Sequence, residues 1–113
     1  MMNAQKYKAK PVMIDGIRFA SQAEGRRYGV LKLLERSGQI TGFELQPVFV
    51  LAPGVLVHGE TRKRPALRYV ADFRYIDKLG REVIEDCKGV QTPVFRVKMH
   101  LLALQGIKVD IVK

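Results

Sequence analysis

The sequence predicts an α/β fold in which a mixed sheet of four strands is flanked by two helices. Two stretches carry helical signals, three β-rich stretches lie between them, and one short β-rich stretch follows the second helix. The resulting order is α-β-β-β-α-β with a small hairpin in front, which indicates a mixed sheet with helices packed against it. At 113 residues the chain fits one small domain and is too short for two independent cores.

The N-terminal part divides into a basic arm and a hairpin. Residues 1–11 carry three lysines and little to bury, so we predict an arm there and a single domain over residues 12–113. Asp15-Gly16 separates two short β-rich stretches, 12–14 and 17–19. An Asp-Gly pair between such stretches is typical of a two-residue hairpin turn.

A first helix is predicted to begin after Ser21. Ser21 and Glu24 have the spacing of a capping box, and apolar residues recur after them at helical period. Gly38 suits the position just past the end of this helix. Gly25 and Gly29 each cost the helix roughly 1 kcal/mol relative to alanine, so we expect a close neighbour against its first turns.

The middle and the end of the chain are predicted to be mainly strands. Residues 40–51 form a strand that contains Pro47, so part of it should lie at a sheet edge. After a loop at 58–65, residues 66–76 and 82–88 form two strands joined by a turn. The last elements are a helix that begins at Thr92-Pro93, runs to about Gln105 and ends at Gly106, and a strand over residues 107–112.

Charge and composition narrow the class of function. Lys and Arg number 20 against 11 Asp and Glu, which gives a formal net charge of +9 and favours a polyanionic partner such as DNA or RNA. One cysteine excludes an internal disulfide framework, and two histidines are too few for a zinc site of Cys and His. The sequence has neither a long apolar run nor a secretory signal, so we expect a cytoplasmic protein without a membrane partner.

Asp86 and Lys88 are the first candidates for chemistry. Side chains alternate along a strand, so these two residues should point to one face together with Ile84, while Glu85 and Cys87 point to the other. A carboxylate beside an ammonium group can hold a hard cation next to a positive charge, as phosphodiester cleavage requires. The alternative is an exposed Asp–Lys pair with no role in catalysis.

Asp72 lies in a strand that is otherwise suited to burial. A turn makes this strand the neighbour of 82–88, so Asp72 and Asp86 could share a metal ion. A carboxylate among apolar residues is costly unless it is paired or bound to a metal. The alternative is an ion pair with Arg68 or Arg74. Three aromatic residues of the same stretch are expected on one core face: Tyr69, Phe73 and Tyr75.

Glu24 has two interpretations. As the fourth residue of the capping box it has a structural role at the start of the helix. It also shares a helix face with Tyr28 and Leu31, so its side chain could instead point toward the sheet.

Asp72 followed after thirteen residues by Asp86-Cys87-Lys88 resembles the metal-binding signature of the PD-(D/E)xK nuclease superfamily. The predicted order of elements is also the usual core order of that superfamily. The chain resembles still more closely a family of small phage-encoded proteins within it, long described as having unknown function. The resemblance covers most of the chain, and Ala71 stands where the superfamily's name has proline. The matching segments are 15–21, Glu24, 33–35, 38–40, 45–49, 69–73, 85–89, Thr92, Phe95 and Lys98.

This resemblance implies a restriction-endonuclease-like core and a Mg²⁺-dependent endodeoxyribonuclease, with Mn²⁺ able to substitute. Asp72 and Asp86 would bind the metal, with the Cys87 carbonyl as a further ligand. Lys88 would orient the attacking water and stabilise the phosphorus centre. Glu24 matches the first-helix glutamate that some members add to the catalytic and metal site.

The resemblance further implies cleavage of branched or duplex DNA in phage recombination, replication or packaging, inside a bacterial host. Junction resolution and flap cleavage are the expected forms, and cutting both strands would suggest a homodimer because one domain has one site. RNA cleavage and a non-catalytic, basic DNA-binding protein are the alternatives. The expected DNA contacts are Arg62, Lys63, Arg64, Arg96 and Lys98; a solvated surface is the alternative for these side chains.

Overall fold

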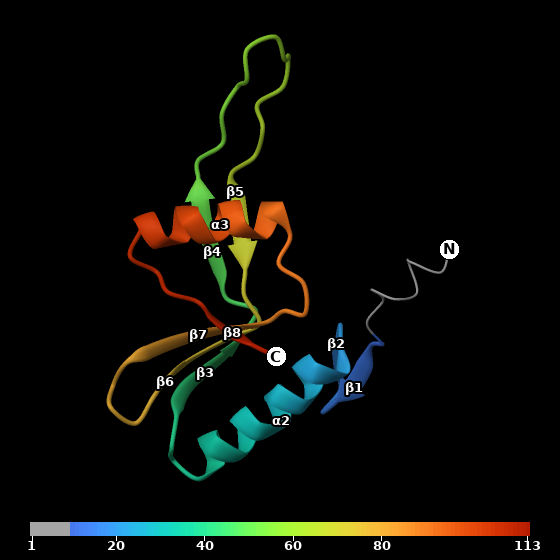
Figure 1. The fold of residues 1–113 in the computed structure, drawn as a ribbon, viewed down its shortest axis with the longest axis vertical. Helices are drawn as coiled ribbons and strands as arrows, with labels where there is room; N and C mark the ends of the chain where they lie inside the picture. The colour runs from blue at the N-terminus through green and yellow to red at the C-terminus, as the bar shows by residue number, and fades with distance from the viewer. Residues whose placement is uncertain (1–9) are drawn as a thin grey trace.

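The computed structural model describes residues 10–113, so most of the predicted basic arm at 1–11 lies outside the described residues. The chain forms eight strands and two helices over this range (Figure 1). Their bounds are β1 Val12–Ile14, β2 Ile17–Phe19, α2 Gln22–Arg36, β3 Thr41–Leu45, β4 Val48–Ala52, β5 Leu67–Val70, β6 Phe73–Ile76, β7 Glu82–Cys87, α3 Pro93–Leu104 and β8 Asp110–Val112.

The hairpin β1–β2 is confirmed and packs against the start of α2. Asp15 and Gly16 both have positive φ values, 55° and 75°, as a tight hairpin turn requires. Gly25 allows the close packing, because a Cβ built there would lie 2.7 Å from Val12 Cγ1. Gly29 has no such neighbour within 4 Å, so the expected close contact holds for Gly25 alone of the two glycines.

The main sheet has four strands in the order β3-β6-β7-β8. β3 and β6, and then β6 and β7, are antiparallel, whereas β7 and β8 are parallel. With α2 before β3 and α3 between β7 and β8, these elements have the predicted α-β-β-β-α-β order and form the predicted mixed sheet. The structure adds an insertion to this order, the two-stranded antiparallel ribbon β4–β5 between β3 and β6.

The prediction of two long strands was wrong, because each of these stretches is divided into two strands at the base of the β4–β5 ribbon. The expected strand 40–51 divides into β3 and β4 at Gln46-Pro47, where Gln46 has a φ of 51°. The expected strand 66–76 divides into β5 and β6 at Ala71-Asp72. The two breaks lie side by side, since the Gln46 amide donates to the Asp72 carbonyl at 2.9 Å.

The breaks give the molecule two hydrophobic clusters instead of one. Phe73 and Tyr75 pack with α2 and the hairpin, whereas Tyr69 packs with Phe49 and with α3. All three predicted core aromatics are buried, but the expectation that they share one face was wrong. The chain leaves the ribbon and enters the main sheet at Ala71-Asp72, so alternation counted through the break no longer predicts the face.

Helix α3 has the predicted boundaries. The Thr92 side chain accepts a hydrogen bond from the Phe95 amide at 3.1 Å, Pro93 is the first helical residue, and Gly106 follows the end with a φ of 77°. The last strand is shorter than predicted, because β8 begins at Asp110 and residues 107–109 lead into it. β8 pairs in parallel with β7 and is the edge strand on that side of the main sheet.

Candidate active site

Asp72 lies beside Asp86, just outside the last pair of the antiparallel β6–β7 strands. The last pair of the β6–β7 register is Phe73 with Glu85, and the Asp72 amide donates to the Glu85 carbonyl at 3.1 Å. The Cys87 amide donates to Asp72 Oδ2 at 2.7 Å, which fixes the carboxylate at the end of β7. The prediction that a turn would make the two strands neighbours is confirmed by the β6–β7 pairing.

Asp86 and Lys88 face the side of the sheet that carries α3. Asp86 is 4% exposed, and its Oδ2 accepts a hydrogen bond from the Tyr69 hydroxyl. The Lys88 ammonium lies 5.0 Å from the centroid of the Phe95 ring on α3. Cys87 packs in the other cluster, with α2, so alternation along this strand follows the prediction and Cys87 is a packed thiol. Burial raises the pKa of the Cys87 thiol to about 12.

Glu24 lies both at the cap of α2 and at the edge of the cleft. Its amide donates to the Ser21 side chain at 3.1 Å, which caps α2, while its carboxyl lines the same cleft as Asp72 and Asp86. Burial and the charge of Asp86 raise the pKa of Glu24, and the Lys88 ammonium opposes this shift. Glu24 therefore interacts with the other candidates through charge across the cleft.

Burial, a hydrogen bond with the Asp86 carboxyl and repulsion between the carboxylates hold the pKa of Asp72 far above its usual range, at about 8. Loss of solvent is the largest cause, and the neighbouring Asp86 and Glu24 carboxyls add to it, whereas the Cys87 amide opposes it. The ion pair with Arg68 or Arg74 is not among those formed by residues 10–113. Arg74 pairs with Glu44 instead, with Nε 2.9 Å from Glu44 Oε1.

These side chains line a cleft of about 960 Å³. Its walls come from the start of α2, the end of β7, the loop that leads into α3, and the C-terminal end of β8. A smaller cleft of about 130 Å³ shares Asp72 and Glu24 and reaches Gln46 at the base of the ribbon. The lining of the larger cleft includes Ser21, Glu24, Asp72, Asp86, Lys88 and Thr92.

The donor set fits a hard divalent cation that keeps part of its water shell. Asp72 and Asp86 offer carboxylate oxygens, the donors that Mg²⁺ prefers, and a cation there would relieve the repulsion that raises the pKa of Asp72. Among residues 10–113 no group of three or more His, Cys, Asp and Glu side chains makes a ligand set by itself. Mg²⁺ is commonly held by one or two carboxylates with waters and substrate phosphates, so two carboxylates suffice for this fit.

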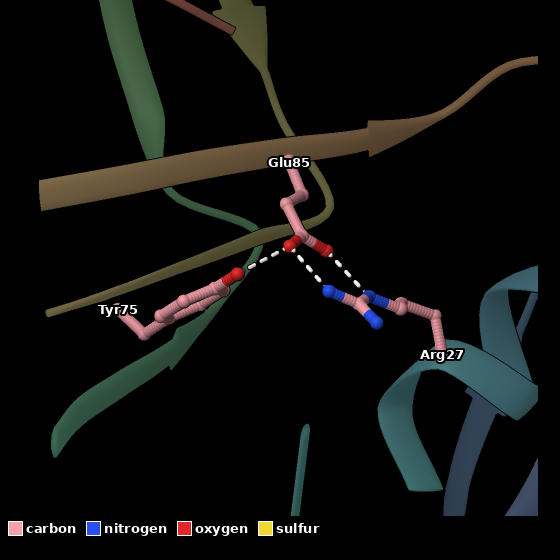
Figure 2. A network of polar contacts seen from close by, with 3 residues as sticks. All are labelled: Arg27, Tyr75 and Glu85. Carbon is pink, nitrogen blue, oxygen red and sulfur yellow. Dashed lines mark hydrogen bonds and ion pairs between the residues drawn. The ribbon is translucent and has the colours of Figure 1, made fainter. Parts of the chain in front are cut away.

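Sequence reasoning missed the role of Glu85, the neighbour of Asp86. Glu85 is 3% exposed and faces α2, where Arg27 donates to both of its carboxylate oxygens (Figure 2). The Tyr75 hydroxyl donates to the same carboxylate, and hydrogen bonding to Glu85 raises the pKa of Arg27. Arg27 lies one turn after Glu24 on α2, so the contact ties the helix that carries Glu24 to the strand that carries Asp86.

The five predicted DNA-contacting residues lie outside the cleft lining. Arg62, Lys63 and Arg64 are exposed on the loop that joins β4 to β5. Arg64 donates to Glu60 at 2.8 Å through Nε, so one of the three cations has a partner within the loop. On α3, Arg96 is exposed and Lys98 is partly buried. No helix formed by the described residues is both long and apolar enough to cross a membrane.

The fold and the cleft define an α/β protein with paired aspartates and a lysine where two neighbouring strands of a mixed sheet meet. The chain belongs to the family described as "Protein of unknown function (DUF1064)", which matches residues 4–112. This match spans the hairpin, both helices, the sheet and the cleft. A search of curated proteins and a search of solved structures each found no significant match.

Proposed function

We propose that the protein is a metal-dependent DNA endonuclease with a restriction-endonuclease-like core, a member of the PD-(D/E)xK superfamily. One observation carries the proposal: Asp72 and Asp86 lie side by side and line one cleft together with Lys88. Carboxylates in a basic protein repel phosphate, so a protein that only binds DNA has no use for them beside Lys88. A metal-dependent phosphodiester hydrolase needs both kinds of group together.

Asp72 and Asp86 would hold Mg²⁺, or Mn²⁺ in its place, with the Cys87 carbonyl as a further ligand. A bound divalent cation supplies stabilisation of the phosphate charge and a more acidic water. Tyr69 fixes the Asp86 carboxylate by donating to Oδ2, and the Cys87 amide fixes that of Asp72. Both carboxylates are therefore oriented by the protein before substrate binds.

Lys88 would stabilise the negative charge that develops on the phosphorus oxygens. Its ammonium lies over the Phe95 ring at 5.0 Å, which limits its freedom within the cleft. Glu24 would accept a proton or add an outer ligand, and burial together with the charge of Asp86 raises the pKa of its carboxyl. The net charge of +9 would draw the phosphate backbone to a cleft that is itself acidic.

The resemblance to phage proteins extends the proposal to branched DNA, as a junction-resolving or flap-cleaving enzyme acting in the cytoplasm of a bacterial host. A homodimer would bring two such sites to one junction and allow both strands to be cut.

The test is a cleavage assay on labelled duplex, flap, four-way junction and single-stranded DNA, and on duplex RNA, with Mg²⁺, Mn²⁺ or Ca²⁺. We expect cleavage of DNA with Mg²⁺ and Mn²⁺, and binding without cleavage in Ca²⁺. Binding of DNA with no cleavage under any metal would favour the non-catalytic DNA-binding alternative. Cleavage of RNA alone would overturn the assignment of DNA as substrate.

A further inference from the structure

The ribbon β4–β5 extends beyond the rest of the fold. Figure 1 shows its connecting loop projecting away from both helices and from the main sheet. Residues 53–66 join Ala52 at the end of β4 to Leu67 at the start of β5. From here on, the arm means this segment and not the basic segment predicted at residues 1–11. The side chains of this ribbon that pack against α3 come from the strands themselves, including Phe49, Leu51 and Tyr69. The arm therefore projects from a base that the core holds.

The arm has internal order of its own. Val55 and Arg64 pair across it through two backbone hydrogen bonds of 3.0 and 2.7 Å. The Glu60 amide donates to the Val57 carbonyl at 3.0 Å and closes the tip as a turn. Gly54 lets the two sides approach, because a Cβ there would lie 2.6 Å from the Arg64 carbonyl oxygen. The tip is thus presented in a defined conformation, at little entropic cost for binding.

The surface of the arm combines apolar and basic groups. Val55, Leu56 and Val57 are 55%, 59% and 37% exposed, so three consecutive apolar residues face solvent. Arg62 and Lys63 are exposed on the returning side of the arm. Exposed apolar residues at a projecting tip indicate a contact surface, because they add nothing to the core.

We propose that the arm enters the major groove of duplex DNA, with Leu56 and its neighbours against the base edges and Arg62 and Lys63 on the phosphates. This inference rests on the proposed function for its choice of DNA as polyanion. The major groove, about 12 Å wide, admits a two-stranded β-ribbon, and the thymine methyl groups there are its apolar feature. Charge disfavours a second copy as the occupant, since both arms carry the same excess of cations.

The base of the arm connects this contact to the candidate active site. β4 begins two residues after Gln46, and β5 ends two residues before Asp72; both residues line the smaller cleft. Eight residues of extended chain, from the tip to this base, span roughly 26 Å at the rise of a strand. A duplex held by the arm would therefore lie within reach of Asp72 and Asp86.

The experiment compares a duplex that contains thymine with the same duplex containing uracil, which lacks the methyl group. Equilibrium binding is measured in Ca²⁺ for the wild type, for Leu56→Ser, and for Leu79→Ser as a matched control. Leu79 is 76% exposed at the β6–β7 turn, so both changes remove an exposed leucine from a turn. We expect the wild type and Leu79→Ser to bind the thymine duplex about 4-fold more tightly for each methyl group buried.

Leu56→Ser should bind the two duplexes equally. A duplex RNA of the same sequence should bind Leu56→Ser and the wild type alike, because its major groove is too deep and narrow for the ribbon. Equal affinity of the wild type for thymine and uracil duplexes would overturn the inference. The inference would also be overturned if the wild type self-associates or binds anionic phospholipid vesicles and Leu56→Ser abolishes that interaction. The tip would then contact another partner.

The two proposals fail in different ways. Cleavage of DNA without discrimination between thymine and uracil would remove the arm from the groove and leave the nuclease in place. Discrimination that depends on Leu56, without cleavage in any metal, would retain the arm as a DNA contact and remove the nuclease.

Discussion

Arg27 donates to both carboxylate oxygens of Glu85, from Nε at 2.8 Å and from Nη2 at 2.7 Å, although 58 residues separate the two in sequence. The pair joins α2 to β7 and so fixes the distance between the elements that carry Glu24 and Asp86. Glu85 is almost fully buried, and Tyr75 completes its hydrogen bonds. A buried carboxylate that loses its cation keeps the cost of burial without compensation.

Arg27→Ala is therefore expected to lower the free energy of unfolding by about 3 kcal/mol, because Glu85 would remain buried beside Tyr75 alone. Urea denaturation followed by circular dichroism measures the loss. Arg26→Ala, at the exposed neighbouring position, is the control and should change stability by less than about 0.5 kcal/mol. An equal and small effect of both changes would mean that the pair contributes little to the fold.

Asp72→Asn and Asp86→Asn are each expected to reduce cleavage by more than about 100-fold, since even outer partners of metal ligands cost roughly 10- to 100-fold. DNA affinity should stay equal or increase, because each change removes negative charge near phosphate. Glu82→Gln, an exposed carboxylate on the same strand as Asp86, should leave both properties unchanged. Wild-type cleavage rates in either aspartate variant would contradict the assignment of these residues.

Lys88→Met should keep metal binding and lose about 100-fold or more in the rate of cleavage, the size expected for a lost contact to a developing oxyanion. Methionine retains the packing against Phe95 while removing the charge. Lys108→Met, at an exposed position before β8, is the control. Single-turnover kinetics at saturating Mg²⁺ separate the two effects, and an unchanged rate would exclude Lys88 from the mechanism.

Without divalent cations, the stability of the protein should fall as the pH rises from about 4 to about 8. Folding raises the pKa of Asp72 to about 8, so within this range the folded state holds a proton that the unfolded state has lost. The stabilisation is complete below the unfolded pKa and disappears as the pH passes the folded one. Thermal unfolding in EDTA at pH 5 and pH 8 measures this fall.

Asp72→Asn should show a smaller fall between these two pH values than the wild type, and Asp110→Asn, an exposed position on β8, should match the wild type. Addition of Mg²⁺ at pH 8 should raise the melting temperature of the wild type and not that of Asp72→Asn, because a cation that binds the folded state stabilises it. Identical profiles for Asp72→Asn and the wild type would show that this carboxyl does not titrate in the range.

Replacement of Arg62 and Lys63 by Gln should weaken binding to every duplex sequence. Each lost phosphate contact lowers the slope of log affinity against log salt by roughly 0.9, so two contacts lower it by about 1.8. Arg64→Gln should add less than a full contact, because Glu60 already binds the Arg64 guanidinium. If all three side chains contacted phosphate, as the sequence predicts, their replacement would lower the slope by about 2.7. An unchanged slope would assign the loop to the solvated surface.

The sequence predicted those parts of the fold that local chemistry determines. Ser21, Thr92-Pro93 and Gly106 mark helix ends through contacts within a few residues, and the structure has these caps. The order of the main elements followed from the same signals. The pairing of the two strands that lead to Asp72 and Asp86 was predictable too, because a short turn joins them.

Long-range geometry was not predictable from the residues. Both strand breaks lie inside β-rich stretches, where Pro47 indicated only a sheet edge and Asp72 only a carboxylate among apolar residues. Tyr69 consequently lies on the α3 side of the sheet, where it donates to Asp86, and not beside Phe73. Arg27 and Glu85 are paired only once α2 has packed on the sheet. The pattern of exposed arginines on a helix gave no signal for this contact.

The paired breaks at Gln46-Pro47 and Ala71-Asp72 separate the arm from the main sheet, so the sequence of the arm can change independently of the sheet. Its residues, 53–66, begin beyond the last strand side chains that reach the α3 core, and the carboxylates lie on the far side of the breaks. Insertions, deletions or replacements of sequence at the tip can therefore change what the arm binds without altering the spacing of Asp72 and Asp86. A new preference for a binding partner could therefore evolve through sequence changes in this one loop, while the residues around Asp72 and Asp86 stay the same.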